Sequence, residues 1–229
     1  MTDIKTLEKA VGLVFKNRSL LTQALSHSSY VNENNSQFGL SNERLEFLGD
    51  AVLGLIVTQH LYLNHPSQTE GDLSRMRSSI IRRETLAKVA QSIELGNYLL
   101  MGKGEGKSGG SRKTANLAGA MEAFIGAVFL EFGMEQVTKF VEKHFSQEIY
   151  LAQNSLKSLD SKSHLQELVQ SRGKDAPIYH VIDEAGPSHR KSFKVEVIVD
   201  GQVLSKGEGL SKKDAEEKAA ANFLKSIDK

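Results

Sequence analysis

The stretch TANLAGAMEAFIGAVFL, residues 114–130, constrains the fold of this chain more than any other segment. It is seventeen residues long and carries a single charge, Glu122. A helix this apolar is normally buried in a protein core. A lone carboxylate inside it is costly unless a positive group meets it, because burial removes its hydration. The stretch therefore predicts a core helix and a cationic partner for Glu122.

The composition is that of a globular, cytoplasmic protein. Its 229 residues allow one large or two ordinary domains, with 39% apolar and 25% charged residues. The apolar runs are too short to span a bilayer, and charges interrupt the N-terminal region where a signal peptide would be apolar, so we expect no membrane partner. The chain has no cysteine, which excludes disulfides and zinc-thiolate sites. A net charge of +1 neither requires nor forbids nucleic acid.

Residues 1–150 are predicted to form an all-α domain. Apolar residues recur there at spacings of three and four, and no segment alternates as a strand would. Further helices are expected over 43–62, about 70–93, 114–131 and 135–150. The following residues, LAQNSLKSLD, are polar and lack a strong period, so we interpret 151–159 as a linker.

Residues 160–229 are predicted to form a small α+β domain in the order α-β-β-β-α. SHLQELVQ fits a short helix, and PIYHVIDEAG and SFKVEVIVDGQVLSKGEG read as strands. The pair Asp200-Gly201 has the residue types of a tight hairpin turn. A closing amphipathic helix has an apolar face that includes Ala215, Ala219, Ala220, Phe223, Leu224 and Ile227.

The stretch SNERLEFLGDAVLG, residues 41–54, carries an acidic stripe. At about 100° per residue, Glu43, Glu46 and Asp50 fall within about 60° of one another on a helix. Gly49 and Gly54 leave room for a bulky group or a close helix contact. The alternative interpretation is a solvated acidic edge, which is favoured for Glu43 because acids are common at a helix start.

Two apolar helices with inward carboxylates would repel each other and raise their pKa values unless they share a cation. Oxygen ligands without cysteine, and without histidine at ligand spacing, favour magnesium or manganese over zinc. A divalent ion held by carboxylates is what phosphodiester hydrolysis needs, because it activates water and neutralises charge on the phosphate. Glu122 and the acidic stripe of residues 43–50 are therefore expected to share such an ion.

The stretch MGKGEGKSGG is similar to a phosphate-binding loop only at its end. Gly106, Lys107 and Ser108 match that motif, but the position of its first glycine is Met101, and no apolar strand precedes it. We expect no nucleotide cofactor. A flexible surface loop or a basic loop facing RNA, through Lys103, Lys107, Arg112 and Lys113, fits better.

The last helix is expected to start near Ser211, with Asp214 completing a capping-box pattern. Lys212 and Lys213 then lie in its first turn, where cations oppose the helix dipole. Such a helix start is suited to an anion, and phosphate is the usual one. The alternative is that both lysines are solvated surface residues.

These segments resemble a known family. NERLEFLGDAVLG resembles the signature helix of ribonuclease III, and ALSHSSY, EGDLSRMR, KSGGSRK and MEAFIGAVFLE match its other segments in order. The region from residue 160 onward is similar to a double-stranded-RNA-binding domain, through LQELVQ, GPSHRKSF and KKDAEEKAA. The resemblance covers nearly the whole chain, which is identified as a member of the bacterial ribonuclease III family.

The resemblance implies a homodimeric, magnesium-dependent endonuclease, with manganese as a substitute, that processes ribosomal precursors and messages. Its products would be duplexes with 5′-phosphates and short 3′ overhangs. Asp50 and Glu122 would be the catalytic acids and, with Glu46, the metal ligands. Glu43 and Glu70 would lie near RNA or the dimer interface. RNA contacts in the second domain would come from Gln166, Glu167, His189, Lys212 and Lys213. Such domains read A-form shape over about 16 base pairs.

One position departs from the family pattern. The motif has an aspartate three residues before the glutamate, and Gly119 stands there in this chain. Position 119 lies on the same helix face as Glu122, about 60° away, so a carboxylate is lost from the expected metal site. Two hypotheses stay open: an active endonuclease with water in place of the missing ligand, or a double-stranded-RNA-binding protein with reduced or no cleavage.

Overall fold

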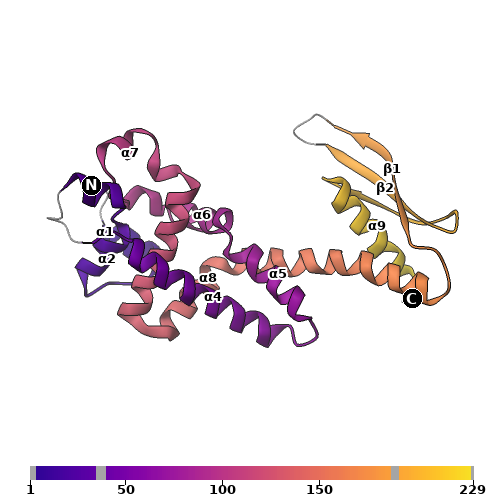
Figure 1. Cartoon of the computed structure of the whole chain (residues 1–229), viewed down its shortest axis with the longest axis horizontal. Helices are drawn as coiled ribbons and strands as arrows, with labels where there is room; N and C mark the ends of the chain where they lie inside the picture. Colours follow the sequence, from indigo (N-terminus) through magenta and orange to yellow (C-terminus); the bar gives the residue numbers. More distant parts are fainter. Residues whose placement is uncertain (1–3, 35–39, 187–190, 228–229) are drawn as a thin grey trace. The chain divides into compact units, whose positions relative to one another are not determined.

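The computed structural model describes residues 4–34, 40–186 and 191–227, and within these it leaves out the side chains of residues 154–160. The chain divides into two compact units, Met1–Ala152 and Gln153–Lys229. The first unit is helical, and the second contains a three-stranded sheet and a packed helix (Figure 1). This confirms the predicted fold class, an all-α domain followed by a small α+β domain.

The first unit is built from helices of five to twenty-two residues around the start of one longer helix. They are α1 (Ile4–Val11), α2 (Arg18–Leu25), α3 (Ser28–Glu33), α4 (Glu43–Asn64), α5 (Glu70–Ile81), α6 (Arg83–Ser92), the short α7 (Lys103–Lys107) and α8 (Thr114–Ser171), with 3-10 turns η1 (Leu95–Tyr98) and η2 (Gly110–Arg112). The predicted helix over 43–62 is confirmed as α4.

The single helix predicted over about 70–93 is wrong, because two helices, α5 and α6, occupy this range. They meet at Arg82, whose backbone is extended (φ −66°, ψ 154°). The Thr85 hydroxyl donates to the Ser79 carbonyl at 2.9 Å, which satisfies an acceptor at the end of α5. No glycine or proline marks this break, so the periodicity alone did not reveal it.

Helix α8 includes the predicted helices 114–131 and 135–150, which are separated by a kink at Gly133 (φ 78°, ψ −179°). The helix then continues to Ser171. Residues 151–159, interpreted from the sequence as a linker, are therefore helical. The physical reason is that no glycine or proline interrupts the chain between Gly133 and Ser171.

The opening stretch is a core helix, as predicted. Its side chains are almost entirely buried: Leu117, Ala118, Ala120, Met121, Ala123, Phe124, Ile125, Ala127 and Val128. By length and composition, Thr114–Gln153 could cross a membrane, but 61% of its most apolar window is buried inside the protein. The apolar character of this helix is therefore explained by the core of the first unit.

Helices α4 and α8 cross at very short range. A Cβ atom added to Gly49 would lie 1.7 Å from the backbone oxygen of Glu122, and one added to Gly126 would lie 2.4 Å from the backbone oxygen of Leu45. Only glycine allows two backbones this close. Gly49 therefore makes the close helix contact that the sequence suggested, whereas Gly54 faces open space.

In the second unit, β1 (Ile178–Ala185), β2 (Ser192–Val199) and β3 (Gln202–Gly209) form an antiparallel sheet in the order β1-β2-β3. Asp200 (φ 49°) and Gly201 (φ 76°) form the predicted tight turn between β2 and β3. The alternating residues of β2 lie inward, with Val195, Val197 and Val199 buried.

Helix α9 (Lys212–Ile227) covers this sheet with Ala219, Ala220 and Leu224, which pack with Leu165 and Val169 from the end of α8 (Figure 1). Ser211 accepts a hydrogen bond from the Asp214 amide at 3.1 Å, as the capping pattern predicts. Ile227, expected on the apolar face, is 41% exposed because it is the last residue of the helix.

The crossing of α4 and α8 leads to a prediction about stability. Gly49→Ala should lower the free energy of unfolding of the first unit by about 3 kcal/mol or more, because its methyl group overlaps the Glu122 backbone. Gly54→Ala is the matched control on the same helix, and it should be neutral or stabilising by about 0.5–1 kcal/mol. Urea denaturation measures both. Equal stability of the two variants would contradict the close crossing.

Candidate functional site

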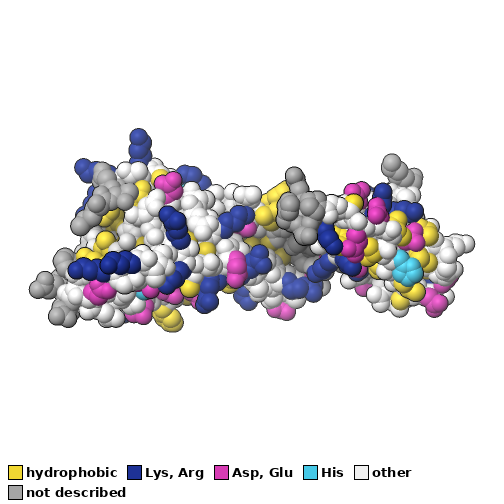
Figure 2. Space-filling view, turned by 90° about the horizontal axis from the view of Figure 1, so that it is seen from above, with side chains coloured by type: hydrophobic (Ala, Val, Ile, Leu, Met, Phe, Trp, Pro, Cys, Tyr) yellow, Lys and Arg dark blue, Asp and Glu magenta, His cyan; other side chains and the backbone are white. Residues whose placement is uncertain are grey.

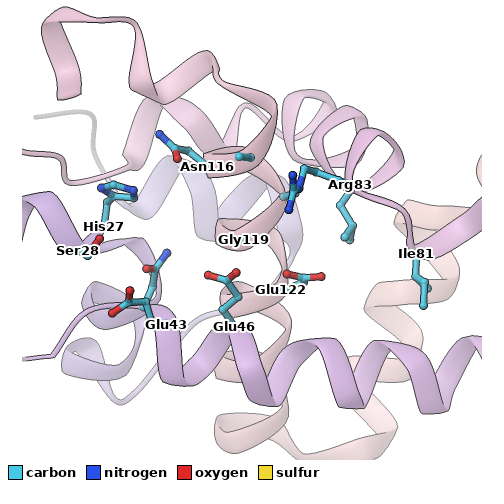
Figure 3. Close-up of a pocket in the computed structure, with 13 residues that line it drawn as sticks. His27, Ser28, Glu43, Glu46, Ile81, Arg83, Asn116, Gly119 and Glu122 are labelled. Atoms are coloured by element: carbon cyan, nitrogen blue, oxygen red, sulfur yellow. The ribbon is translucent and has the colours of Figure 1, made fainter. Parts of the chain in front are cut away.

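A cavity of about 430 Å³ opens between α4, α6 and α8 in the first unit (Figure 3). Its floor is formed by apolar side chains such as Leu86 and Ala118. Its polar lining comes from His27, Ser28, Asn42, Glu43, Glu46, Arg83, Asn116 and Glu122. The close crossing of α4 and α8 thus places acidic residues from two distant parts of the sequence around one space.

Glu122 from α8 carries the largest electrostatic perturbation in this cavity. Burial, followed by the negative charges of Asp50 and Glu46, raises the pKa of the Glu122 carboxyl to about 7, against a smaller opposing effect of Arg83. The carboxylate is therefore poorly stabilised by the protein itself near neutral pH. A bound cation would restore its charged form.

Glu46 from α4 faces the same space (Figure 3). Burial and the neighbouring charge of Glu43 raise the pKa of the Glu46 carboxyl as well. Glu43 lines the cavity nearer its rim, where its side chain accepts a hydrogen bond from the Ser41 hydroxyl at 2.7 Å. Glu43 and Glu46 of the predicted acidic stripe thus line the same cavity as Glu122.

Asp50 lies one turn beyond Glu46 on α4 and is exposed. It does not line the cavity, but its charge contributes to the raised pKa of Glu122. Glu46, Asp50 and Glu122 therefore form one electrostatic group at the helix crossing.

Gly119 lies on the same face of α8 as Glu122 and lines the cavity. A Cβ atom added there would lie 2.7 Å from Oε2 of Glu46, so a side chain at this position would point directly at the α4 carboxylate. An aspartate at position 119 would bring another carboxylate into the cavity. Glycine at this position contributes neither a negative charge nor an oxygen ligand to the site.

The donors of the cavity fit a hard divalent cation in type and charge. They are carboxylates with uncompensated negative charge, which favour magnesium or manganese. Within the described residues, no three histidine, aspartate or glutamate side chains already converge on one point at metal-binding distance.

Glu70 lies away from these carboxylates. It begins α5 and accepts a hydrogen bond from the Ser74 hydroxyl at 2.7 Å. It lines a separate groove with Tyr62 and Arg77. The structure therefore does not bring Glu70 to the acidic cavity within the first unit.

Three further polar residues line the cavity: Asn116 and Arg83 had no role assigned from the sequence, whereas His27 of ALSHSSY was interpreted as structural. His27 caps α3, since its Nδ1 accepts from the Ser29 amide at 3.2 Å. Asn116 donates to Glu105 at 2.8 Å and to the Gly110 carbonyl at 3.0 Å, which fixes the loop before α8. Arg83 begins α6, and the unpredicted helix break at Arg82 positions it. Of Asn116 and Arg83, only Asn116 stands out in the sequence, because it is a polar residue within the apolar stretch 114–130.

The glycine-rich segment does not present a free phosphate-binding helix start. The amides of Lys103 and Gly104 at the start of α7 donate to the Glu33 carboxylate at 2.7 and 3.4 Å. Lys113 pairs with Glu105 at 2.9 Å. These contacts give the segment a structural role beside the cavity.

The predicted RNA-contacting residues of the second unit lie on its surface where they are described. Gln166 and Glu167 are exposed near the end of α8. Lys212 pairs with Glu184 of β1 at 2.8 Å, whereas exposed Lys213 makes no ion pair with any described residue. His189 lies outside the described residues. Basic and acidic side chains are interspersed on the face shown in Figure 2.

Comparison with known proteins identifies both units. Residues 17–149 match the family model described as ribonuclease-III-like, and residues 161–227 match the model of the double-stranded RNA binding motif.

Relatives named "Ribonuclease 3" match over almost their full length. One from Dehalococcoides mccartyi is 46% identical over 228 residues, covering 100% of this chain and 96% of that protein. One from Oceanobacillus iheyensis is 43% identical, covering 98% of each. The crystal structure of the nuclease domain of ribonuclease III from Campylobacter jejuni is 38% identical, with a TM-score of 0.59, covering 64% of this chain and 96% of that one.

The raised pKa of Glu122 predicts how pH affects the stability of the metal-free chain. Its folded-state pKa of about 7 lies above the usual glutamate value of 4.5, so its contribution to stability is fully present below pH 4.5 and is lost as the pH rises through 7. Thermal melting in chelator should show stability falling between pH 5 and pH 8, and Glu122→Gln should flatten this fall.

The matched control is Glu135→Gln, which removes one charge from an exposed position on the same helix. It should leave the fall between pH 5 and pH 8 unchanged, because the contact with Lys139 lowers the pKa of the Glu135 carboxyl and its titration lies below this range. A pH dependence that is identical in the Glu122→Gln variant and the wild type would show that Glu122 is not perturbed.

Proposed function

Because the chain belongs to the ribonuclease III family of endoribonucleases and carries a double-stranded-RNA-binding domain, we propose that it hydrolyses phosphodiester bonds of double-stranded RNA with Mg²⁺ as cofactor. The products are duplexes with 5′-phosphates and short 3′ overhangs. The observation that carries this proposal is the acidic cavity, in which Glu46 and Glu122 face each other with raised pKa values.

Glu46, Asp50 and Glu122 would hold the metal ion, and Mn²⁺ would substitute for Mg²⁺ because both prefer oxygen ligands. The ion, when bound, activates the attacking water and neutralises charge on the phosphate and the leaving oxygen. Asp50 and Glu122 are the proposed catalytic acids. The position left by the carboxylate missing at Gly119 would be taken by water, which magnesium sites commonly retain.

The second unit is proposed to hold the duplex. Gln166, Glu167 and Lys213 offer exposed polar groups, and Lys212 would exchange its contact with Glu184 for a phosphate. His189, which lies outside the described residues, is proposed as a further RNA contact. Cellular substrates would be ribosomal precursors and messages in the cytoplasm, processed without a nucleotide cofactor.

A homodimer is proposed on the basis of a second surface of α4. Phe47 is 82% exposed and lies beside an apolar hollow of about 620 Å³ lined by Leu20, Leu40, Leu45, Leu48 and Leu130. An exposed aromatic ring next to such a hollow is suited to pairing with a second copy. A solved ribonuclease III nuclease domain from Campylobacter jejuni is described as having a region involved in dimer formation. Glu43, which also lines this hollow, would lie near the dimer interface.

The second candidate function is that of a double-stranded-RNA-binding protein with little cleavage. It is favoured by Gly119, since the cavity lacks the carboxylate that would approach Glu46. Cleavage and binding assays on the same duplex separate the two candidates.

The test of the endonuclease proposal is cleavage of a long RNA duplex across a Mg²⁺ titration. The unmodified chain should cleave, and Glu122→Ala should lower the rate at least about a hundredfold while duplex binding persists. Gly119→Asp should lower the Mg²⁺ concentration for half-maximal rate roughly tenfold, because it adds a carboxylate beside Glu46.

Gly119→Ala is the matched control, since it adds the same Cβ atom without a carboxylate. It should not improve the response to Mg²⁺. If the unmodified chain binds duplex RNA but cleaves none at any Mg²⁺ level, the binding-protein alternative holds instead.

The RNA-binding role of the last helix predicts a change in salt dependence. Replacing both Lys212 and Lys213 by Ala should weaken duplex binding and reduce the slope of log affinity against log salt by about 1 to 2, because phosphate contacts are lost. Lys225→Ala, at the other end of α9, is the control. An unchanged slope in the double variant would remove these lysines from the interface.

A further inference from the structure

Arg83 is a positively charged residue at a position where the local structure does not favour one. It is the first residue of α6, where a positive charge opposes the helix dipole. Its side chain is exposed, and it makes no ion pair with a carboxylate of the described residues. The neighbouring Arg82, by contrast, has a local role, since its Nε donates to the Thr85 hydroxyl at 3.3 Å.

The guanidinium of Arg83 faces the acidic cavity. It lines that space with Gly119 and Glu122, and Figure 3 shows it on the α6 side, directed into the space that the carboxylates share. Glu46 lines the same space from α4. Arg83 is thus near both carboxylates without being paired to either, and the open cavity lies between them.

Among the described residues that line the cavity, Arg83 is the one lysine or arginine. An RNA phosphate entering this space would be repelled by Glu43, Glu46 and Glu122. A guanidinium on the opposite wall offsets that repulsion, and its planar fork matches two oxygens of one phosphate. Glycine at position 119 adds no further carboxylate to the cavity. An entering anion therefore meets less negative charge than it would with an aspartate at this position.

We propose that Arg83 binds the phosphodiester group of the RNA strand to be cut, and so positions it against the α4 and α8 carboxylates. This inference rests on the proposed endonuclease function and adds a phosphate-binding residue to it. The contact is with the substrate, so losing it slows cleavage without weakening the hold of the carboxylates on the metal ion.

The test compares the full chain with Arg83→Gln, which removes the charge, and Arg83→Lys, which keeps the charge but loses the fork. Lys88→Gln is the matched control, because it removes one positive charge from an exposed position on the same helix, outside the cavity lining. Single-turnover cleavage is measured at saturating duplex RNA and Mg²⁺. Binding of Mn²⁺ alone, without RNA, is measured by electron paramagnetic resonance.

Arg83→Gln is expected to cleave roughly tenfold more slowly or worse, with Arg83→Lys in between and Lys88→Gln at the wild-type rate. Mn²⁺ should bind Arg83→Gln as tightly as the wild type or more tightly, since a repelling cation is gone. Free guanidinium should partly restore cleavage by an Arg83→Ala variant.

A wild-type cleavage rate in Arg83→Gln would overturn the inference while leaving the endonuclease function intact. Loss of Mn²⁺ binding in Arg83→Gln would also overturn it, because Arg83 would then support the carboxylates and not the phosphate. An equal loss of rate in Lys88→Gln would overturn it too, because the effect would then come from the total charge of α6 and not from a contact with the phosphate. If the wild-type chain does not cleave, the proposed function fails and the inference fails with it.

Discussion

Helices α4 and α8 approach each other where Gly49 lies against the Glu122 backbone and Gly126 lies against the Leu45 backbone. A side chain at either position would force the two helices apart. Because acidic residues occur one turn before and one residue after Gly49, the same contact that builds the core also brings Glu46 and Asp50 to Glu122. The packing of the first unit and the chemistry of its cavity therefore depend on one steric condition.

That condition has an electrostatic consequence. Carboxylates that the fold forces together cannot all remain charged near neutral pH without a cation, and burial increases the cost. Burial and its acidic neighbours therefore raise the pKa of the Glu122 carboxyl to about 7. A divalent ion and the guanidinium of Arg83 offset this negative charge in different ways. The ion would bind the carboxylates, whereas Arg83 is proposed to bind the anionic phosphate of the substrate. Without a carboxylate at position 119, the cavity has one ligand fewer for the ion and one negative charge fewer to repel the phosphate.

Sequence patterns predicted the fold class, the core helix around Glu122, the Asp200-Gly201 turn and the shared face of Gly119 and Glu122. These features follow from short-range spacing and residue type. The break at Arg82 and the helical state of residues 151–159 were not predicted. The break depends on a hydroxyl contact between Thr85 and Ser79, and the helix continues because nothing stops it. Arg83 was missed for the same reason, since only the break directs it toward carboxylates that belong to other helices.

Binding of Mn²⁺ to the chain without RNA tests most directly whether the α4 and α8 carboxylates share one ion. The measurement is a double-mutant cycle of Glu46→Gln and Glu122→Gln, with affinity determined by electron paramagnetic resonance titration. If both residues hold the same ion, each single variant should weaken binding by about tenfold or more, and the double variant should lose less than the product of the two effects. Unchanged affinity in the single variants, or losses that simply multiply, would contradict a shared metal site at the helix crossing.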